Sequence, residues 1–158
     1  MKRASALLFG LLSAALLLRP EPVRAEADPA ATSRTSQPHI QLDRLTFPAD
    51  LIGAKQYEGH LRSTLKREAR HADWGAGSNS TISYRFFVEQ LDLREEAGVL
   101  HVSCTARGRL PKGKSAKSHI VFGGDPRDRK KVIERVLDIV ARGVVTRLAE
   151  LEKARRTP

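Results

Sequence analysis

The sequence predicts an α+β domain in which two helices pack on one face of a mostly antiparallel four-stranded sheet. Two segments carry apolar residues at helical spacing, and four carry apolar residues at alternate positions. Their order along the chain is β-α-β-β-β-α. Placing two amphipathic helices on one face of a sheet buries the apolar stripe of each helix in a single core. We expect this single domain to span residues 39–152.

The first strand and the first helix are predicted before residue 74. Apolar residues of the strand come in two alternating pairs, and the parity changes near Asp43–Arg44, which predicts a bulge there. These four residues are Ile40, Leu42, Leu45 and Phe47. An amphipathic helix of about five turns follows, from near Gly53 to Asp73.

Three further strands are predicted between Thr81 and Phe122. The first of them, Thr81–Arg94, carries apolar residues on both faces, so it is either central in the sheet or changes face at a bulge. A hairpin turn over Glu95–Gly98 leads to a half-buried strand in which apolar and polar residues alternate up to Arg107. A short last strand is expected at Ser118–Phe122.

A second helix is predicted after Gly124. Asp125 is a suitable N-cap residue, Pro126 fits the first helical position, and Asp128 suits the first turn. A broad apolar stripe follows, which should pack against the sheet. Its members are Val132, Ile133, Val136, Leu137, Val140, Val144, Leu148 and Leu151, widened by Ile139 and Val145. Residues 153–158 are expected to form a basic tail, suited to the negative end of the helix dipole.

The first 25 residues have the three parts of a cleavable signal peptide. Basic residues precede an apolar run from Ala4 to Leu18, and Val23-Arg24-Ala25 supplies the small residues that a signal peptidase needs. The run is shorter than the roughly 20 apolar residues of a membrane span, although an uncleaved anchor is the alternative. Cleavage removes four basic residues and one acid, so the formal net charge falls from +10 to +7. Residues 26–38 are expected to form a disordered leader.

The single cysteine and the histidines indicate no catalytic or metal site. Cys104 lies in the alternating strand and is most simply a small buried residue, with a nucleophile or an intermolecular disulfide as alternatives. His60 and His71 would lie about 16 Å apart on one helix, too far to share a metal. His101 and His119 lie on consecutive strands, and no third ligand is implied. We predict no catalytic residue, no cofactor and no metal.

A phosphate-loop pattern occurs at residues 108–115 and is predicted to be accidental. Gly108–Ser115 matches G-x-x-x-x-G-K-[ST] at every position. A phosphate loop presents its amides at the N-terminus of a helix. Here Ser115 leads into a short β-like segment that ends at Gly123-Gly124, so no helix can begin there. We predict no nucleotide binding.

The segment 107–117 is the predicted contact surface, because it holds five positive charges and no acid. We expect a hairpin loop that turns these charges outward, with Gly108 and Gly113 leaving the backbone free to adapt. The charged residues are Arg107, Arg109, Lys112, Lys114 and Lys117. Anionic lipid, lipopolysaccharide or an envelope protein would be the partner, with peripheral membrane contact; a merely solvated loop is the alternative. Nucleic acid is not expected, because the chain is predicted to be exported and has eight aromatic residues.

The order of elements from Ile40 to Leu151 resembles that of small periplasmic α/β modules of bacterial envelope proteins, such as the lipopolysaccharide-assembly lipoprotein family. The resemblance lies in architecture and involves no signature residue. The sequence departs from that family in having no lipobox cysteine after its signal. The prediction is therefore a periplasmic or secreted, non-enzymatic envelope protein that binds a protein or an anionic component. A small periplasmic enzyme is the alternative.

Overall fold

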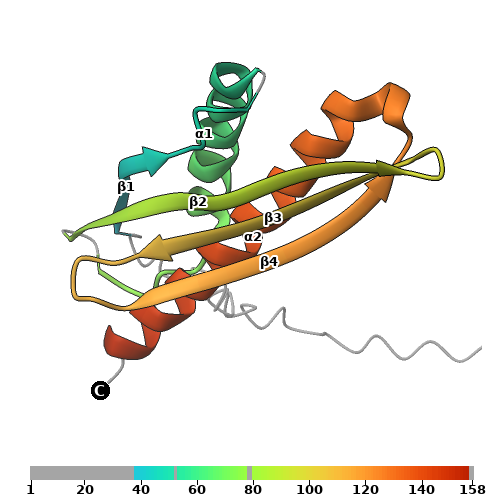
Figure 1. The fold of residues 1–158 in the computed structure, drawn as a ribbon. Coiled ribbons are helices and arrows are strands. Elements are labelled where there is room, and N and C mark those ends of the chain that lie inside the picture. Colours follow the sequence, from blue (N-terminus) through green and yellow to red (C-terminus); the bar gives the residue numbers. More distant parts are fainter. Residues whose placement is uncertain (1–37, 52, 78–79, 157–158) are drawn as a thin grey trace, which may run out of the picture. The chain divides into compact units, whose positions relative to one another are not determined.

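Four strands form one sheet in the order β1-β2-β3-β4, and two helices cover one face of it (Figure 1). The computed structural model describes residues 38–51, 53–77 and 80–156. The predicted signal peptide and the leader up to residue 37 lie outside these ranges, whereas Pro38 is described and buried. The elements are β1 (His39–Thr46), α1 (Ala54–His71), β2 (Thr81–Glu96), β3 (Val99–Arg109), β4 (Ser115–Gly124), a short 3₁₀ turn η1 (Pro126–Asp128) and α2 (Arg129–Arg156).

The predicted fold class and element order are confirmed, and the sheet is mixed. β1 pairs with β2 in parallel through the α1 crossover, whereas β2–β3 and β3–β4 are antiparallel. The register of β1 shifts between Leu42 and Arg44, where the sequence predicts a bulge. A second shift, between Val88 and Gln90, changes which alternate residues of β2 face the core. Before it these are Ile82, Tyr84, Phe86 and Val88, and after it Leu91 and Leu93 pack against the core.

The β2–β3 hairpin has the predicted turn. Its two central residues, Ala97 and Gly98, have φ angles of 50° and 76°. Positive φ at both positions is typical of a type I′ turn, whose twist matches that of the flanking strands. In β3, alternate residues are buried as predicted, and these are Leu100, Val102, Cys104 and Ala106.

Three details of the prediction are wrong. The last strand begins at Ser115 rather than Ser118, so the connection after β3 is a loop over residues 110–114 and not a long basic loop up to Lys117. Helix α2 continues to Arg156, so residues 153–156 belong to the helix and not to a tail. Ile139 is 39% exposed and does not widen the buried stripe, whereas Val145 is fully buried.

A tryptophan that shows no periodic pattern in the sequence helps to fill the core. Trp74 follows α1 and is 1% exposed. Its indole N–H donates to the carbonyl oxygen of Ala69 over 2.9 Å, and its ring centroid lies 6.1 Å from that of Tyr84. The hydrogen bond satisfies the only polar group of the buried indole. Trp74 thereby attaches the end of α1 to β2.

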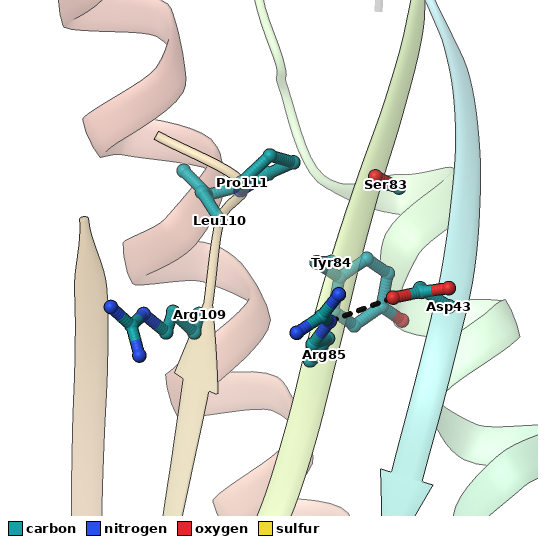
Figure 2. Close-up of a pocket in the computed structure, with 7 residues that line it drawn as sticks. All are labelled: Asp43, Ser83, Tyr84, Arg85, Arg109, Leu110 and Pro111. Carbon is teal, nitrogen blue, oxygen red and sulfur yellow. Dashed lines mark hydrogen bonds and ion pairs between the residues drawn. The ribbon is translucent and has the colours of Figure 1, made fainter. Parts of the chain in front are cut away.

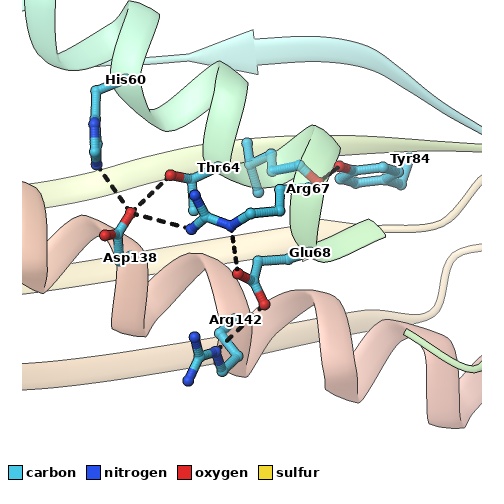
Figure 3. A network of polar contacts seen from close by, with 8 residues as sticks. His60, Thr64, Arg67, Glu68, Tyr84, Asp138 and Arg142 are labelled. Carbon is cyan, nitrogen blue, oxygen red and sulfur yellow. Dashed lines mark hydrogen bonds and ion pairs between the residues drawn. The ribbon is translucent and has the colours of Figure 1, made fainter. Parts of the chain in front are cut away.

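A polar network joins the two helices above the sheet (Figure 3). The carboxylate of Asp138 on α2 accepts a 2.7 Å hydrogen bond from the buried Thr64 hydroxyl and lies 2.9 Å from Nε2 of His60. Glu68 of α1 lies 3.3 Å from Nε of Arg142 on α2. Because hydrogen bonds are directional, these contacts fix the axial position of α1 relative to α2.

Candidate functional site

Two of the five predicted contact residues are held by a shared acid. Arg107 of β3 and Lys117 of β4 face each other in register on the sheet. Arg107 lies 2.8 Å and Lys117 3.2 Å from the carboxylate of Glu89, at the bulge of β2. The expectation that one hairpin loop holds all five charges is therefore wrong, because Arg107 and Lys117 lie on strands, although all five side chains are exposed. Glu89 is far from segment 107–117 in sequence and reaches it only through strand pairing.

Arg109 ends β3 beside a second arginine, as Figure 2 shows. It faces Arg85 of β2 in register, and Arg85 donates to Asp43 over 2.7 Å. Among the described residues Arg109 has no ion-pair partner. Both arginines line a hollow of about 350 Å³ that continues past Leu110 and Pro111. Arg109 therefore adds a positive charge beside the 110–114 loop.

The 110–114 loop is a closed turn that carries two lysines. Leu110 donates its amide to the Lys114 carbonyl over 2.8 Å, and the Gly113 amide donates back to Leu110 over 3.1 Å. Gly113 has φ of 84°, a conformation that favours glycine. Lys112 and Lys114 are exposed and make no ion pair with any described residue.

Gly108 does not give the loop freedom, contrary to expectation. It is buried within β3, and an added Cβ would lie 2.6 Å from side-chain atoms of both Val144 and Leu148 on α2. The absence of a side chain therefore lets α2 pack directly on the strand backbone. That close approach places the C-terminal end of α2 next to the loop.

The two loop lysines and the end of α2 line one pocket of about 310 Å³. Arg155 and Arg156 lie on its helical side, together with the acid Glu152. Four cations and one acid leave an excess of three positive charges around this cavity. We call it the cationic pocket, defined by Lys112, Lys114, Arg155, Arg156 and Glu152.

Glu152 positions both arginines. Its side chain is 7% exposed, and its two oxygens accept from Nε of Arg155 over 2.9 Å and Nε of Arg156 over 3.0 Å. Arg156 also donates to the Ser80 hydroxyl over 3.0 Å and to the Ala76 carbonyl over 3.3 Å. One buried carboxylate thus fixes two guanidinium groups before any ligand arrives, which lowers the entropy lost on binding.

The electrostatics of Glu152 follow from this arrangement. The hydrogen bond from Arg155 lowers the pKa of Glu152 below its ordinary value; partial burial opposes the effect, and Arg156 adds to it. In return, Glu152 raises the pKa of Arg155. The carboxylate is therefore ionised at neutral pH and keeps the two arginines in place.

The sequence does not predict Arg155 and Arg156 as site residues, because the predicted helix ends before them, whereas α2 continues to Arg156. Glu152 precedes them by three and four positions, and that spacing brings acid and base together on one helix face. This spacing alone predicts the ion pairs of Glu152 with both arginines. Their meeting with Lys112 and Lys114 depends on the packing of α2 on β3, which no local pattern encodes.

The remaining candidates occupy the positions that the sequence suggests. Ser115 begins a strand and not a helix, as predicted; the absence of nucleotide binding stays a prediction. Cys104 is fully buried, and burial raises the pKa of its thiol to about 12, so the structural interpretation of this cysteine is confirmed. His101 pairs with Gly123 and His119 with Thr105, four residues apart along β4. The described residues contain no group of three or more metal-ligand side chains.

No protein-family model matches the sequence, and no curated protein matches it. Solved structures similar to this chain include a candidate lipoprotein from Caulobacter crescentus, with TM-score 0.41, 13% identity, and coverage of 63% of this chain and 83% of the other. A minor lipoprotein from Acinetobacter baumannii has TM-score 0.40, 12% identity, and coverage of 78% and 96%. The PelC dodecamer from Paraburkholderia phytofirmans has TM-score 0.39, 10% identity, and coverage of 71% and 88%.

Two of these three proteins are described as lipoproteins. At these TM-scores and identities the likeness supports no inference about function. Among the helices that the structure describes, none is both long enough and apolar enough to span a membrane.

Proposed function

We propose that this chain is an exported, non-enzymatic envelope protein that binds phosphate-bearing lipid headgroups through the cationic pocket. One observation carries the proposal: Lys112 and Lys114 line the same pocket as Arg155 and Arg156, with Glu152 as the one acid among its lining residues. The predicted signal peptide in the first 25 residues supports export to a compartment where such headgroups are exposed.

The chemistry of the four cations suits a phosphate group. Arginine presents a planar fork of N–H donors that matches phosphate oxygens, and Arg155 has one terminal amino group with no hydrogen-bond partner among the described residues. Lys112 and Lys114 supply two further positive charges from the loop that lines the same pocket. A concave site of one charge sign concentrates oppositely charged ligands. Exposed lysines contribute little to folding, so stability does not explain them.

Binding to vesicles tests the proposal. The chain beginning at Glu26 should bind vesicles that contain phosphatidylglycerol and not vesicles of phosphatidylcholine alone. Binding should weaken as salt rises, because exposed charges are screened over about 8–10 Å near physiological ionic strength. The double variant Lys112→Ser/Lys114→Ser should lose about tenfold or more in affinity, equivalent to about 1.4 kcal/mol.

A matched control is available at the other end of α2. Lys130 and Lys131 are exposed and adjacent, and replacing both with Ser removes the same charge away from the pocket. This control variant should retain most of the affinity, and both variants should melt at nearly the same temperature as the parent. Equal losses in the two double variants would show that net charge, not the cationic pocket, determines binding and would refute the proposal.

A further inference from the structure

A second groove lies between β1 and α1, away from the residues of the cationic pocket. Its volume is about 420 Å³, and it follows five consecutive residues of the chain, Pro38–Leu42. Helix α1 lines the groove with three cations, Arg62, Lys66 and Arg70. The other lining residues include Ala69 and Tyr84, which add apolar surface. A groove that runs along a strand, with cations on one wall, is suited to an elongated and acidic occupant.

The strand side of this groove is a free sheet edge. β1 is the outermost strand, and its side away from β2 has no strand partner among the described residues. The His39 amide donates to the Ser80 carbonyl over 3.0 Å, towards β2. Because main-chain groups alternate in direction along a strand, those of Ile40 and Leu42 point to the free edge. Such groups are a template for an added strand.

The helix side carries one cation per turn. Arg62, Lys66 and Arg70 are four residues apart and all exposed. Lys66 and Arg70 make no ion pair with any described residue, and Arg62 pairs with Glu58 over 2.9 Å in a solvent-exposed contact that a ligand can replace. A rise of 1.5 Å per residue places successive cations about 6 Å apart along the helix.

We infer that this groove binds an extended acidic segment of a partner protein, added as a strand to the free edge of β1. In an extended chain, side chains at positions i and i+2 lie on one face about 6.6 Å apart. That spacing nearly equals the spacing of Arg62, Lys66 and Arg70. The bound segment therefore carries acidic residues at alternate positions, facing α1. The free main-chain groups favour a peptide over a lipid, because only a peptide pairs with both donors and acceptors of the edge.

Two peptides of equal composition test this inference. One is Thr-Glu-Val-Glu-Val-Glu-Thr, with alternating acids, and its isomer is Thr-Val-Glu-Glu-Glu-Val-Thr. The alternating peptide should bind about tenfold tighter, measured by the fluorescence anisotropy of a terminal label. It should also slow hydrogen exchange at the amides of Ile40 and Leu42. Lys66→Gln/Arg70→Gln should abolish most of the binding, and Lys130→Gln/Lys131→Gln should leave it unchanged.

Three results would overturn the inference. Equal affinities for the two isomers would show that binding depends on the net charge of the peptide and not on the spacing of its acidic residues. Unaltered exchange at Ile40 and Leu42 on binding would exclude strand addition. The lack of saturable binding up to about 1 mM of the alternating peptide would exclude the site altogether. The variant Lys112→Ser/Lys114→Ser should bind the peptide normally, so failure of this site and failure of the proposed function are distinguishable.

Discussion

At the scale of single residues, Glu152 connects folding to the candidate site. It is buried at the end of α2 and pairs with two arginines that would otherwise repel each other and the nearby lysines. Its pKa is lowered from an ordinary value of 4.5. A lowered pKa in the folded state means that the ionised form stabilises the fold above pH 4.5. This stabilisation is lost as pH falls through the folded-state pKa.

Replacing Glu152 with Gln tests this interpretation. The variant should be less stable at pH 7 by about 1–3 kcal/mol, since the amide keeps the shape but not the charge that the guanidinium groups require. The difference from the parent should shrink as pH falls below 4.5 and through the lowered pKa of Glu152 in the folded parent, where its carboxylate becomes protonated. Urea unfolding at pH 7 and pH 3 measures both quantities. A difference that is the same at the two pH values would contradict the role given to the charge.

At the scale of elements, the contact between α2 and β3 positions the site, and two glycines allow it to be tested. Gly108 of β3 has Val144 and Leu148 within 2.6 Å of a hypothetical Cβ, whereas Gly59 on α1 has no atom within 4 Å. Gly108→Ala should destabilise the protein by about 1–3 kcal/mol through overpacking. Gly59→Ala should stabilise it by about 0.4–1 kcal/mol through helix propensity.

Thermal unfolding of the two variants measures these opposite effects. Gly108→Ala should also weaken vesicle binding, because displacing α2 separates Arg155 and Arg156 from the loop lysines. If Gly108→Ala were as stable as the parent, α2 would not pack on the backbone of β3 as described, and the geometry of the cationic pocket would be wrong.

Most elements could be predicted because their signals are local. The parity change near Asp43 indicates the β1 bulge, and the spacing of apolar residues defines both helices. The start of β4 could not be predicted, because Ser115, Ala116 and Lys117 show no apolar alternation. Those residues are strand-like because they pair with β3, from Arg109 back to Arg107. Pairing between distant segments overrides local propensity in such cases.

At the scale of the whole domain, some cationic side chains have an acidic partner and others have none among the described residues. Several cations have an acidic partner, as in the pairs Arg85–Asp43, Arg107–Glu89 and Lys131–Asp128. The loop lysines have no acidic partner among the described residues, and they line the cationic pocket together with Arg155 and Arg156. The charge density of segment 107–117 predicts the loop half of the cationic pocket as a contact surface. The helix half could not be predicted from a local pattern, because tertiary packing brings Arg155 and Arg156 to the loop.

Locating the lipid-binding site on the protein tests the cationic pocket directly. The isotope-labelled chain beginning at Glu26 would be titrated with short-chain phosphatidylglycerol and observed by two-dimensional NMR. We expect the largest changes in chemical shift at Lys112, Lys114, Arg155 and Arg156, and these changes should disappear in Lys112→Ser/Lys114→Ser. Changes centred elsewhere, or changes that persist in that variant, would contradict the assignment of the cationic pocket as the headgroup site.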